Sequence, residues 1–161
     1  MAPSSTLIYR RSGFGIAVSL CILAFTACDY EDPITSSPTR KVQERLLGNW
    51  ISQDGKEHLK VRRLDDNIYI VCYDGDLFRA YHSDVADTPF VSVQDINFED
   101  RTYAYVVWKL SDDSKQLILR SVNRDVIPKE KKDSTAVAKF LKDNAKNPDL
   151  FGEEIQFRKE K

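Results

Sequence analysis

Apolar and polar residues alternate with a period of two along most of the chain beyond residue 56. Short alternating runs rich in β-branched and aromatic residues are typical of strands that bury one face. Trp50 marks a further, shorter strand ahead of them. The other predicted strands occupy 57–63, 68–73, 77–83, 90–94, 103–110, 116–122 and 154–159.

Short polar breaks separate several of these runs. Residues 65–67, 74–76 and 112–114 have the composition of tight turns, and Asp74-Gly75 gives the strongest signal because glycine accepts a positive φ. Connections this short are too brief for parallel crossovers. The pattern therefore predicts a mainly β protein: an antiparallel meander of about eight strands that closes into a barrel and so removes its exposed edges.

A helical period is clear in one place, residues 134–146, ahead of the last strand. Asp133 or Ser134 is expected to cap this helix. The run 68–73 is apolar on both faces, so we expect the helix to cover its outer side. A shorter helix is predicted over 41–47, before the first strand. The packing stripe of the longer helix consists of Val137, Phe140 and Leu141.

The start of the chain has a different pattern. Residues 14–25 form an apolar run that follows Arg10 and Arg11 and leads through small residues to Cys28. This order of charge, apolar run and small residues is typical of a secretory signal. A dozen residues cover roughly 18 Å as a helix, well short of the ~30 Å hydrocarbon layer, so we expect export rather than a permanent transmembrane helix.

The residues Phe25-Thr26-Ala27-Cys28 resemble the lipobox of bacterial lipoproteins, in which the cysteine is acylated and becomes the first mature residue. The resemblance implies a signal peptide over 1–27 and fatty acids, such as palmitate, on Cys28. It also implies a location in the bacterial cell envelope, anchored to the inner or the outer membrane, with the domain on the periplasmic or extracytoplasmic side. An ordinary signal peptide, cleaved near Ala27, is the alternative.

Composition divides the rest of the chain in two. Residues 28–38 contain two prolines, acids and hydroxyls, which predicts a flexible tether, and 39–161 are enough for one barrel domain. Without the leader the chain has 22 basic and 25 acidic residues, a formal charge of about −3. Nucleic-acid binding favours a concentrated basic face, so we expect no nucleic-acid partner.

Catalytic chemistry has few candidate residues. The sequence lacks the His-Glu-x-x-His, Cys-x-x-Cys and Gly-x-Ser-x-Gly motifs, so we expect no enzyme activity, metal or cofactor. His82 shares a strand face with Phe78 and Ala80, which favours a buried histidine at the barrel end over a ligand or base. Cys72 is expected to be a small core residue rather than a redox group.

Gly48-Asn49-Trp50 resembles the Gly-x-Trp signature that opens lipocalins, and its position before a meander extends the resemblance over 41–161. The resemblance implies a lipocalin-like barrel with Trp50 packed across the floor, under an arginine from a late strand. Arg120 and Arg158 are the candidates. The layout also looks like small bacterial lipoproteins of lipocalin-like shape.

Two functions follow from such a barrel. The first is a non-catalytic interaction or structural module that docks an envelope protein through exposed tyrosines. The alternative is binding of a small apolar or amphipathic ligand in the lumen. The tyrosines expected on the surface are Tyr73, Tyr81, Tyr103 and Tyr105. The residues expected to face the lumen or its ligand are Trp50, Phe78, Val106, Trp108 and Leu119.

Overall fold

The structure is a computed structural model that describes residues 30–128 and 133–160. The signal peptide predicted over 1–27 and the lipidation predicted at Cys28 lie outside the described residues. Among the helices in the described ranges, none has both the length and the apolar character needed to cross a membrane.

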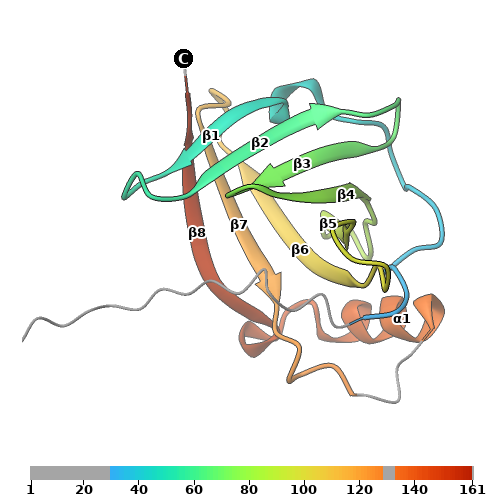
Figure 1. Cartoon of the computed structure of the whole chain (residues 1–161). Coiled ribbons are helices and arrows are strands. Elements are labelled where there is room, and N and C mark those ends of the chain that lie inside the picture. Colours follow the sequence, from blue (N-terminus) through green and yellow to red (C-terminus); the bar gives the residue numbers. More distant parts are fainter. Residues whose placement is uncertain (1–29, 129–132, 161) are drawn as a thin grey trace, which may run out of the picture.

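Eight antiparallel strands form one closed barrel, in which each strand pairs with its neighbours in sequence and β1 pairs with β8 (Figure 1). The mainly β fold and the closed eight-stranded meander are confirmed. The strands are β1 (Gly48–Ser52), β2 (His58–Arg63), β3 (Tyr69–Tyr73), β4 (Asp76–His82), β5 (Phe90–Asp95), β6 (Tyr103–Leu110), β7 (Gln116–Val122) and β8 (Phe151–Lys159).

The predicted turns join the strands as expected. Asp74 and Gly75 have φ values of +47° and +106° and form the two-residue loop of the β3–β4 hairpin. Positive φ at both positions matches the twist of the flanking strands. In the β2–β3 turn the Asp65 carboxylate accepts from the backbone N–H groups of Asn67 and Ile68, at 2.7 and 2.9 Å.

Helical structure differs in part from the prediction. The α-helix α1 spans Ser134–Asn144, and its N-terminus is capped by the Asp133 carboxylate, which accepts from Ala136 N–H. The helix predicted over 41–47 is wrong: only a single 3-10 turn, η1 (Glu44–Leu46), forms there. A second 3-10 turn, η2 (Pro148–Leu150), leads into β8.

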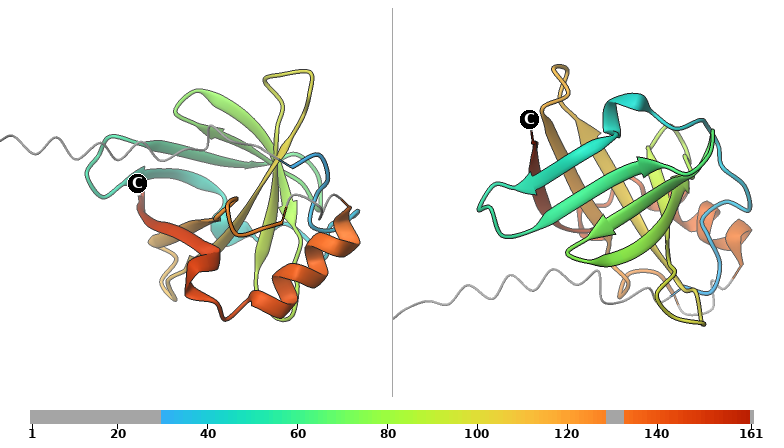
Figure 2. Two further views of the ribbon diagram at one scale, coloured as in Figure 1. Left: turned by 90° about the horizontal axis from the view of Figure 1, so that it is seen from below. Right: turned by 45° about the horizontal axis from the view of Figure 1, so that its top comes forward.

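The barrel has two different ends (Figure 2). One end, which we call the floor, contains η1, the β2–β3, β4–β5 and β6–β7 turns and the end of β8. The opposite end, which we call the rim, contains the β1–β2, β3–β4 and β5–β6 turns. Residues 39–47 run across the floor: Thr39 N–H donates to His82 C=O, and Val42 N–H donates to Asp66 C=O.

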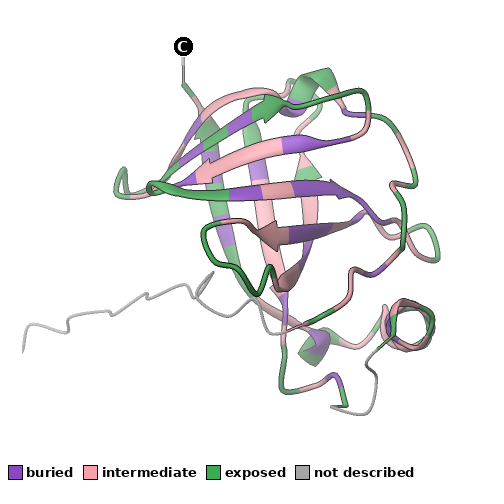
Figure 3. Ribbon diagram, turned by 45° about the vertical axis from the view of Figure 1, so that its right-hand side comes forward, coloured by how far each residue is buried: buried purple, intermediate pink, exposed green. Residues whose placement is uncertain are grey.

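Buried apolar residues form two separate clusters, one on each side of the barrel wall. Figure 3 shows buried stretches both in the strands and in the segments outside the barrel. The lumen core lies inside the barrel and combines alternate residues of the strands with Val42 and Leu46 from the floor. The outer core lies between the outside of β5–β7 and the segments that cover it. Its fully buried and nearly buried members are Ile34, Phe90, Tyr105, Val122, Ile127, Val137, Leu141 and Leu150.

The segment predicted as a tether is part of this second core from Tyr30 onward. Ile34 has no exposed surface, and its N–H donates to the Ser92 hydroxyl at 3.0 Å. Tyr105 Oη donates to the Asp32 carbonyl at 2.7 Å, and Ser134 Oγ donates to the Pro33 carbonyl. Residues 30–38 differ from the prediction because their few apolar side chains fit between α1 and the barrel wall.

The stripe on α1 packs as predicted, but its partner is different. Val137 and Leu141 are buried in the outer core, with Phe140 partly buried beside them, against β5 and β6 rather than β3. Because α1 does not cover β3, its outward-facing residues Ile70 and Cys72 are only half-buried, beside strands β2 and β4. The aliphatic stems of neighbouring lysine and arginine side chains can shield such residues without a covering helix.

Candidate binding site in the barrel lumen

The lumen core does not fill the barrel. A cavity of about 80 Å³ with a wholly apolar surface lies between the strands. Four of the five residues predicted to face the lumen line it: Phe78, Val106, Trp108 and Leu119. The fifth, Trp50, is fully buried in the lumen core but does not line the cavity. The other lining residues are Leu46, Leu59, Val61, Tyr69, Val71, Tyr73, Ala80, Val91, Val93 and Leu117.

The size and chemistry of the cavity limit what it can hold. An apolar cavity of about 150 Å³ stays dry and binds benzene. The cavity of about 80 Å³ is roughly half that size. It suits an apolar group of a few carbon atoms rather than a whole lipid chain. Its surface offers no polar partner to water, so an apolar occupant is favoured over a hydrated one.

Trp50 closes the floor, as the Gly-x-Trp resemblance implied. The cation over its ring, however, is not an arginine. Trp50 Nε1 donates to the Leu46 carbonyl at 2.9 Å, which joins the indole to η1. The Lys159 ammonium lies 5.0 Å from the ring centroid and donates to the Arg45 carbonyl at 3.0 Å. A cation over the indole face contributes electrostatic attraction to the packing.

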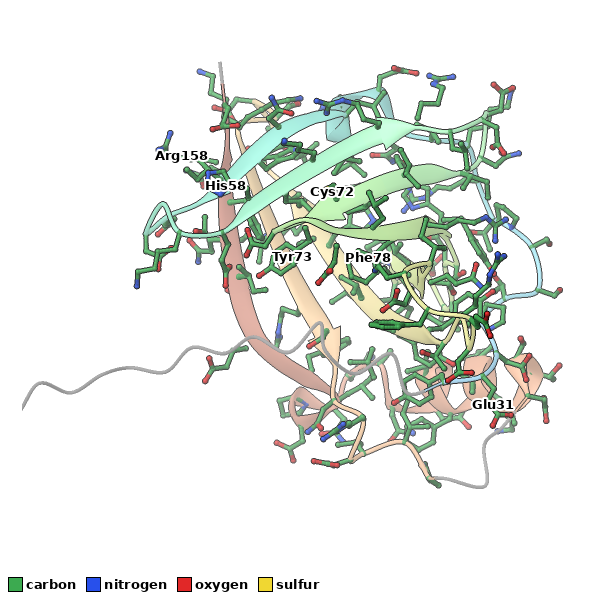
Figure 4. All side chains as sticks on the ribbon, in the orientation of Figure 1. Glu31, His58, Cys72, Tyr73, Phe78 and Arg158 are labelled. Carbon is green, nitrogen blue, oxygen red and sulfur yellow. The ribbon has the colours of Figure 1, made fainter. Side chains whose placement is uncertain are left out.

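The two arginines expected over Trp50 lie elsewhere. Arg120 points outward over the Phe151 ring, 5.1 Å from its centroid, and its Nε donates to the Gly152 carbonyl. Arg158 projects from the outer side of β8 (Figure 4). Lys159 follows Phe157 by two residues and so continues the inward-facing series of β8. That alternation was the signal in the sequence that could have identified it.

His82 is fully buried at the floor, as predicted, between Tyr69 and Trp108. Tyr69 Oη accepts from Gln43 N–H at 2.7 Å, so we assign its proton to the 2.7 Å bond with His82 Nε2, which places the imidazole proton on Nδ1. Burial, together with the nearby Arg40 charge, lowers the pKa of His82 to about 4. The imidazole is therefore neutral at pH 7 and is held as a structural acceptor.

At the other end the cavity reaches Tyr73, the last residue of β3, and Phe78 near the start of β4 (Figure 4). Burial raises the pKa of the Tyr73 phenol, and the Glu57 carboxylate raises it further. Tyr73 is thus a neutral phenol at physiological pH. The cavity therefore extends from a floor closed by residues 39–47 toward the rim.

The tyrosines expected on the surface are mostly covered by the chain itself. Tyr73 lines the lumen, and Tyr81 and Tyr105 are buried under residues 30–35. Tyr81 Oη donates to the Thr35 carbonyl at 2.8 Å. Tyr103 is half-buried beside Tyr30. The predicted docking face of four exposed tyrosines is wrong, because the segment interpreted as a tether occupies it.

Cys72, expected in the core, instead points to the outside of β3, since Val71 and Tyr73 on either side of it face the lumen (Figure 4). Within the described ranges, no three His, Cys, Asp or Glu side chains gather in a way that could hold a metal ion. The apolar cavity is thus the feature of the described residues best suited to bind another molecule.

Comparisons of the chain with protein-family models, with curated proteins and with solved structures find no match.

Proposed function

We propose that the barrel is the non-catalytic binding domain of a lipid-anchored envelope lipoprotein. Its lumen takes a small apolar molecule, or the apolar end of an amphipathic one. The observation that carries this proposal is the unfilled, wholly apolar cavity between a closed floor and the rim. A lipocalin-like architecture is part of the proposal. The meander, the 3-10 turn before β1 and Trp50 at the floor all support it.

Unfilled apolar volume favours a ligand for a physical reason. Atoms that line a void lack van der Waals partners on one side, and proteins lose roughly 24 cal/mol for each Å³ of such volume. For a cavity of about 80 Å³ this is about 2 kcal/mol. An occupant of matching shape recovers part of this free energy and adds the burial of its own apolar surface.

The test uses the mature chain and two probes, benzene and a series of straight-chain alcohols of increasing length. Saturable binding, measured by calorimetry and by the fluorescence of Trp108, supports the proposal. Val71→Ile and Val91→Ile each add a methylene to the cavity wall. We expect the double variant to bind the probes about tenfold more weakly. The matched control is Val107→Ile, on the outer side of β6. The absence of saturable binding, or an equal loss in the control, would contradict the proposal.

A second function is favoured by a different observation. Leu77 and Phe98 are exposed apolar residues at the rim, so the domain can act as an interaction or structural module without a soluble ligand. Exposed apolar residues that cluster mark interaction sites more often than scattered ones do. An envelope protein and a membrane surface are the two kinds of partner for such a site.

The proposed anchor is tested separately at Cys28. Cys28→Ser should abolish the incorporation of labelled palmitate and leave an unprocessed precursor, whereas Cys72→Ser, on the outside of β3, should be acylated normally. Acylation of the Cys28→Ser chain would contradict the lipoprotein assignment.

A further inference from the structure

The most exposed large apolar side chains of the rim lie in two adjacent turns. Phe98, in the β5–β6 turn, is 71% exposed, and Leu77, beside the β3–β4 turn, is 44% exposed. Asn97 joins the turns: its Oδ1 accepts from Leu77 N–H at 3.1 Å, and its Nδ2 donates to the Leu77 carbonyl at 3.0 Å. Ile96 N–H also donates to that carbonyl. We call Leu77, Ile96 and Phe98 the rim patch.

The first described residues of the chain lie at the same end of the barrel. Tyr30 pairs with Tyr103, the first residue of β6, through N–H···O bonds of 3.2 and 2.7 Å in the two directions. The Tyr30 ring stacks on Tyr105 with 4.2 Å between centroids. The β5–β6 turn that carries Phe98 ends at Thr102, whose carbonyl accepts from Asp95 N–H. The point at which the chain joins the barrel therefore lies at the base of the turn that holds the rim patch.

The distance from Tyr30 to the proposed lipid is short. Cys28 lies two positions before Tyr30 in the sequence, and an extended chain spans at most about 7 Å over two positions. Acyl chains on Cys28 would therefore hold the base of the β5–β6 turn close to the membrane surface. A ten-residue tether would have allowed the domain to tumble about 30 Å away, but residues 30–38 are fixed on the barrel.

We propose that the rim patch inserts into the surface of the lipid bilayer that holds Cys28, so that the rim faces the lipid and the floor faces away from it. This inference rests on the proposed acylation of Cys28. Apolar side chains of peripheral proteins enter the boundary between headgroups and acyl chains to a depth of about 5–10 Å. In this orientation the Tyr73–Phe78 end of the cavity faces the membrane.

Charge at the rim indicates which lipids this contact prefers. Four exposed carboxylates and one cation, that of Arg101, lie in or beside the two turns of the rim patch, and their net negative charge opposes contact with an anionic surface. The insertion is therefore driven by apolar burial rather than by charge attraction, and it should be strongest on zwitterionic phosphatidylcholine. The carboxylates are those of Asp74, Asp76, Glu99 and Asp100 (Figure 3 colours their loops as exposed).

The test places a fluorescent reporter at each end of the acylated mature chain in phosphatidylcholine vesicles. Phe98→Trp reports on the rim patch, and Leu64→Trp is the matched control, since Leu64 is 57% exposed in the β2–β3 turn at the floor. The signal of Trp50 and Trp108 is measured in the unsubstituted chain and subtracted. In vesicles of brominated phosphatidylcholine, bromine quenches tryptophan within the acyl region. We expect the added fluorescence at residue 98 to fall by about half or more, and that at residue 64 to stay unchanged.

Two outcomes overturn the inference. No quenching at residue 98 means that the rim is in water and free to dock a protein, and equal quenching at 98 and 64 means that the domain has no fixed orientation. If Cys28 carries no acyl chain in cells, the anchor proposal fails by itself. The orientation is then tested on the mature chain with Cys72→Ser, so that Cys28 is its one thiol. Cys28 is coupled to a lipid that carries a maleimide headgroup and mixes with phosphatidylcholine. Quenching is measured with the same two tryptophan reporters, and its outcomes have the same meaning.

Discussion

The lumen core and the outer core share the same barrel wall, and the cavity of about 80 Å³ lies on the lumen side of it. Inside, the wall is one closed meander, and closure fixes the distance between facing strands, so side chains that do not reach across leave space. Outside, the covering elements are α1 and residues 30–38, which can approach until they touch. Six outer residues are at most 1% exposed: Ile34, Phe90, Tyr105, Val137, Leu141 and Leu150. The covering segments thus close these side chains off from solvent.

The largest expected effect in either core is at Trp50. Trp50→Ala removes a fully buried indole, its bond to the Leu46 carbonyl and its contact with Lys159, and should destabilise the domain by about 3–5 kcal/mol. Urea denaturation measures the loss. Trp50→Phe is the control, because it keeps most of the apolar volume, and it should lose clearly less. An unchanged midpoint for the alanine variant would remove Trp50 from the lumen core.

Ile34 tests whether the outer core is part of the folded domain. Ile34→Ala should cost about 2–4 kcal/mol, because the side chain is fully buried between the wall and α1. The matched control is Ser36→Ala, two residues away and exposed, which should change the free energy of unfolding by no more than about 0.5 kcal/mol. Equal, small effects would mean that residues 30–38 behave as the flexible tether that their composition predicts.

His82 gives the lumen floor a pH dependence in the acidic range. The unfolded chain binds the imidazole proton near pH 6.5 and the folded chain only near pH 4, so the unfolded state binds more protons between these values. The free energy of unfolding should therefore fall with decreasing pH, by about 2–3 kcal/mol by pH 4 on account of this group. His82→Gln, whose amide oxygen can accept from Tyr69, is the reference. Parallel pH profiles for the two proteins would contradict the assignment of a buried neutral imidazole.

The smallest expected effect on stability comes from adding one methylene to either side of the barrel wall. Val91→Ile extends into the cavity and should leave stability unchanged or raise it by up to about 1 kcal/mol. Val137→Ile adds the methylene to the closely packed outer core and should cost about 1 kcal/mol or more. Thermal unfolding of the two variants decides the comparison. Equal losses would mean that the lumen is packed as densely as the outer core.

Local patterns predicted the strands well because strand formation depends on alternation and on turn chemistry, both of which are local. The bounds predicted for β6 and β7 are those of the structure, and Asp74-Gly75 forms the predicted hairpin loop. The conformation of residues 41–47 was not predictable in the same way. Residues 44–46 are held by their contact with the floor, and three residues of 3-10 turn leave little periodicity to detect.

The residues around the site were predictable to different degrees. Four of the five residues expected to face the lumen line the cavity, because the period of two decides which side of a strand a residue faces. The cavity itself was not predictable, since its volume depends on how far side chains from opposite walls reach. The cation over Trp50 was assigned to the wrong residue, although the alternation of β8 places Lys159 on the same inward face as Phe157.

The sequence by itself determined the strands, their order and which residues face inward, since these follow from periodicity and short connections between neighbours. Only the tertiary structure decided the fate of residues 30–38, the side of the barrel that α1 covers and the empty volume in the lumen. Each of these depends on contacts between residues far apart in the chain, such as Tyr30 with Tyr103 and Pro33 with Ser134. Composition cannot report such contacts, because the surface that receives a segment exists only after the barrel has closed.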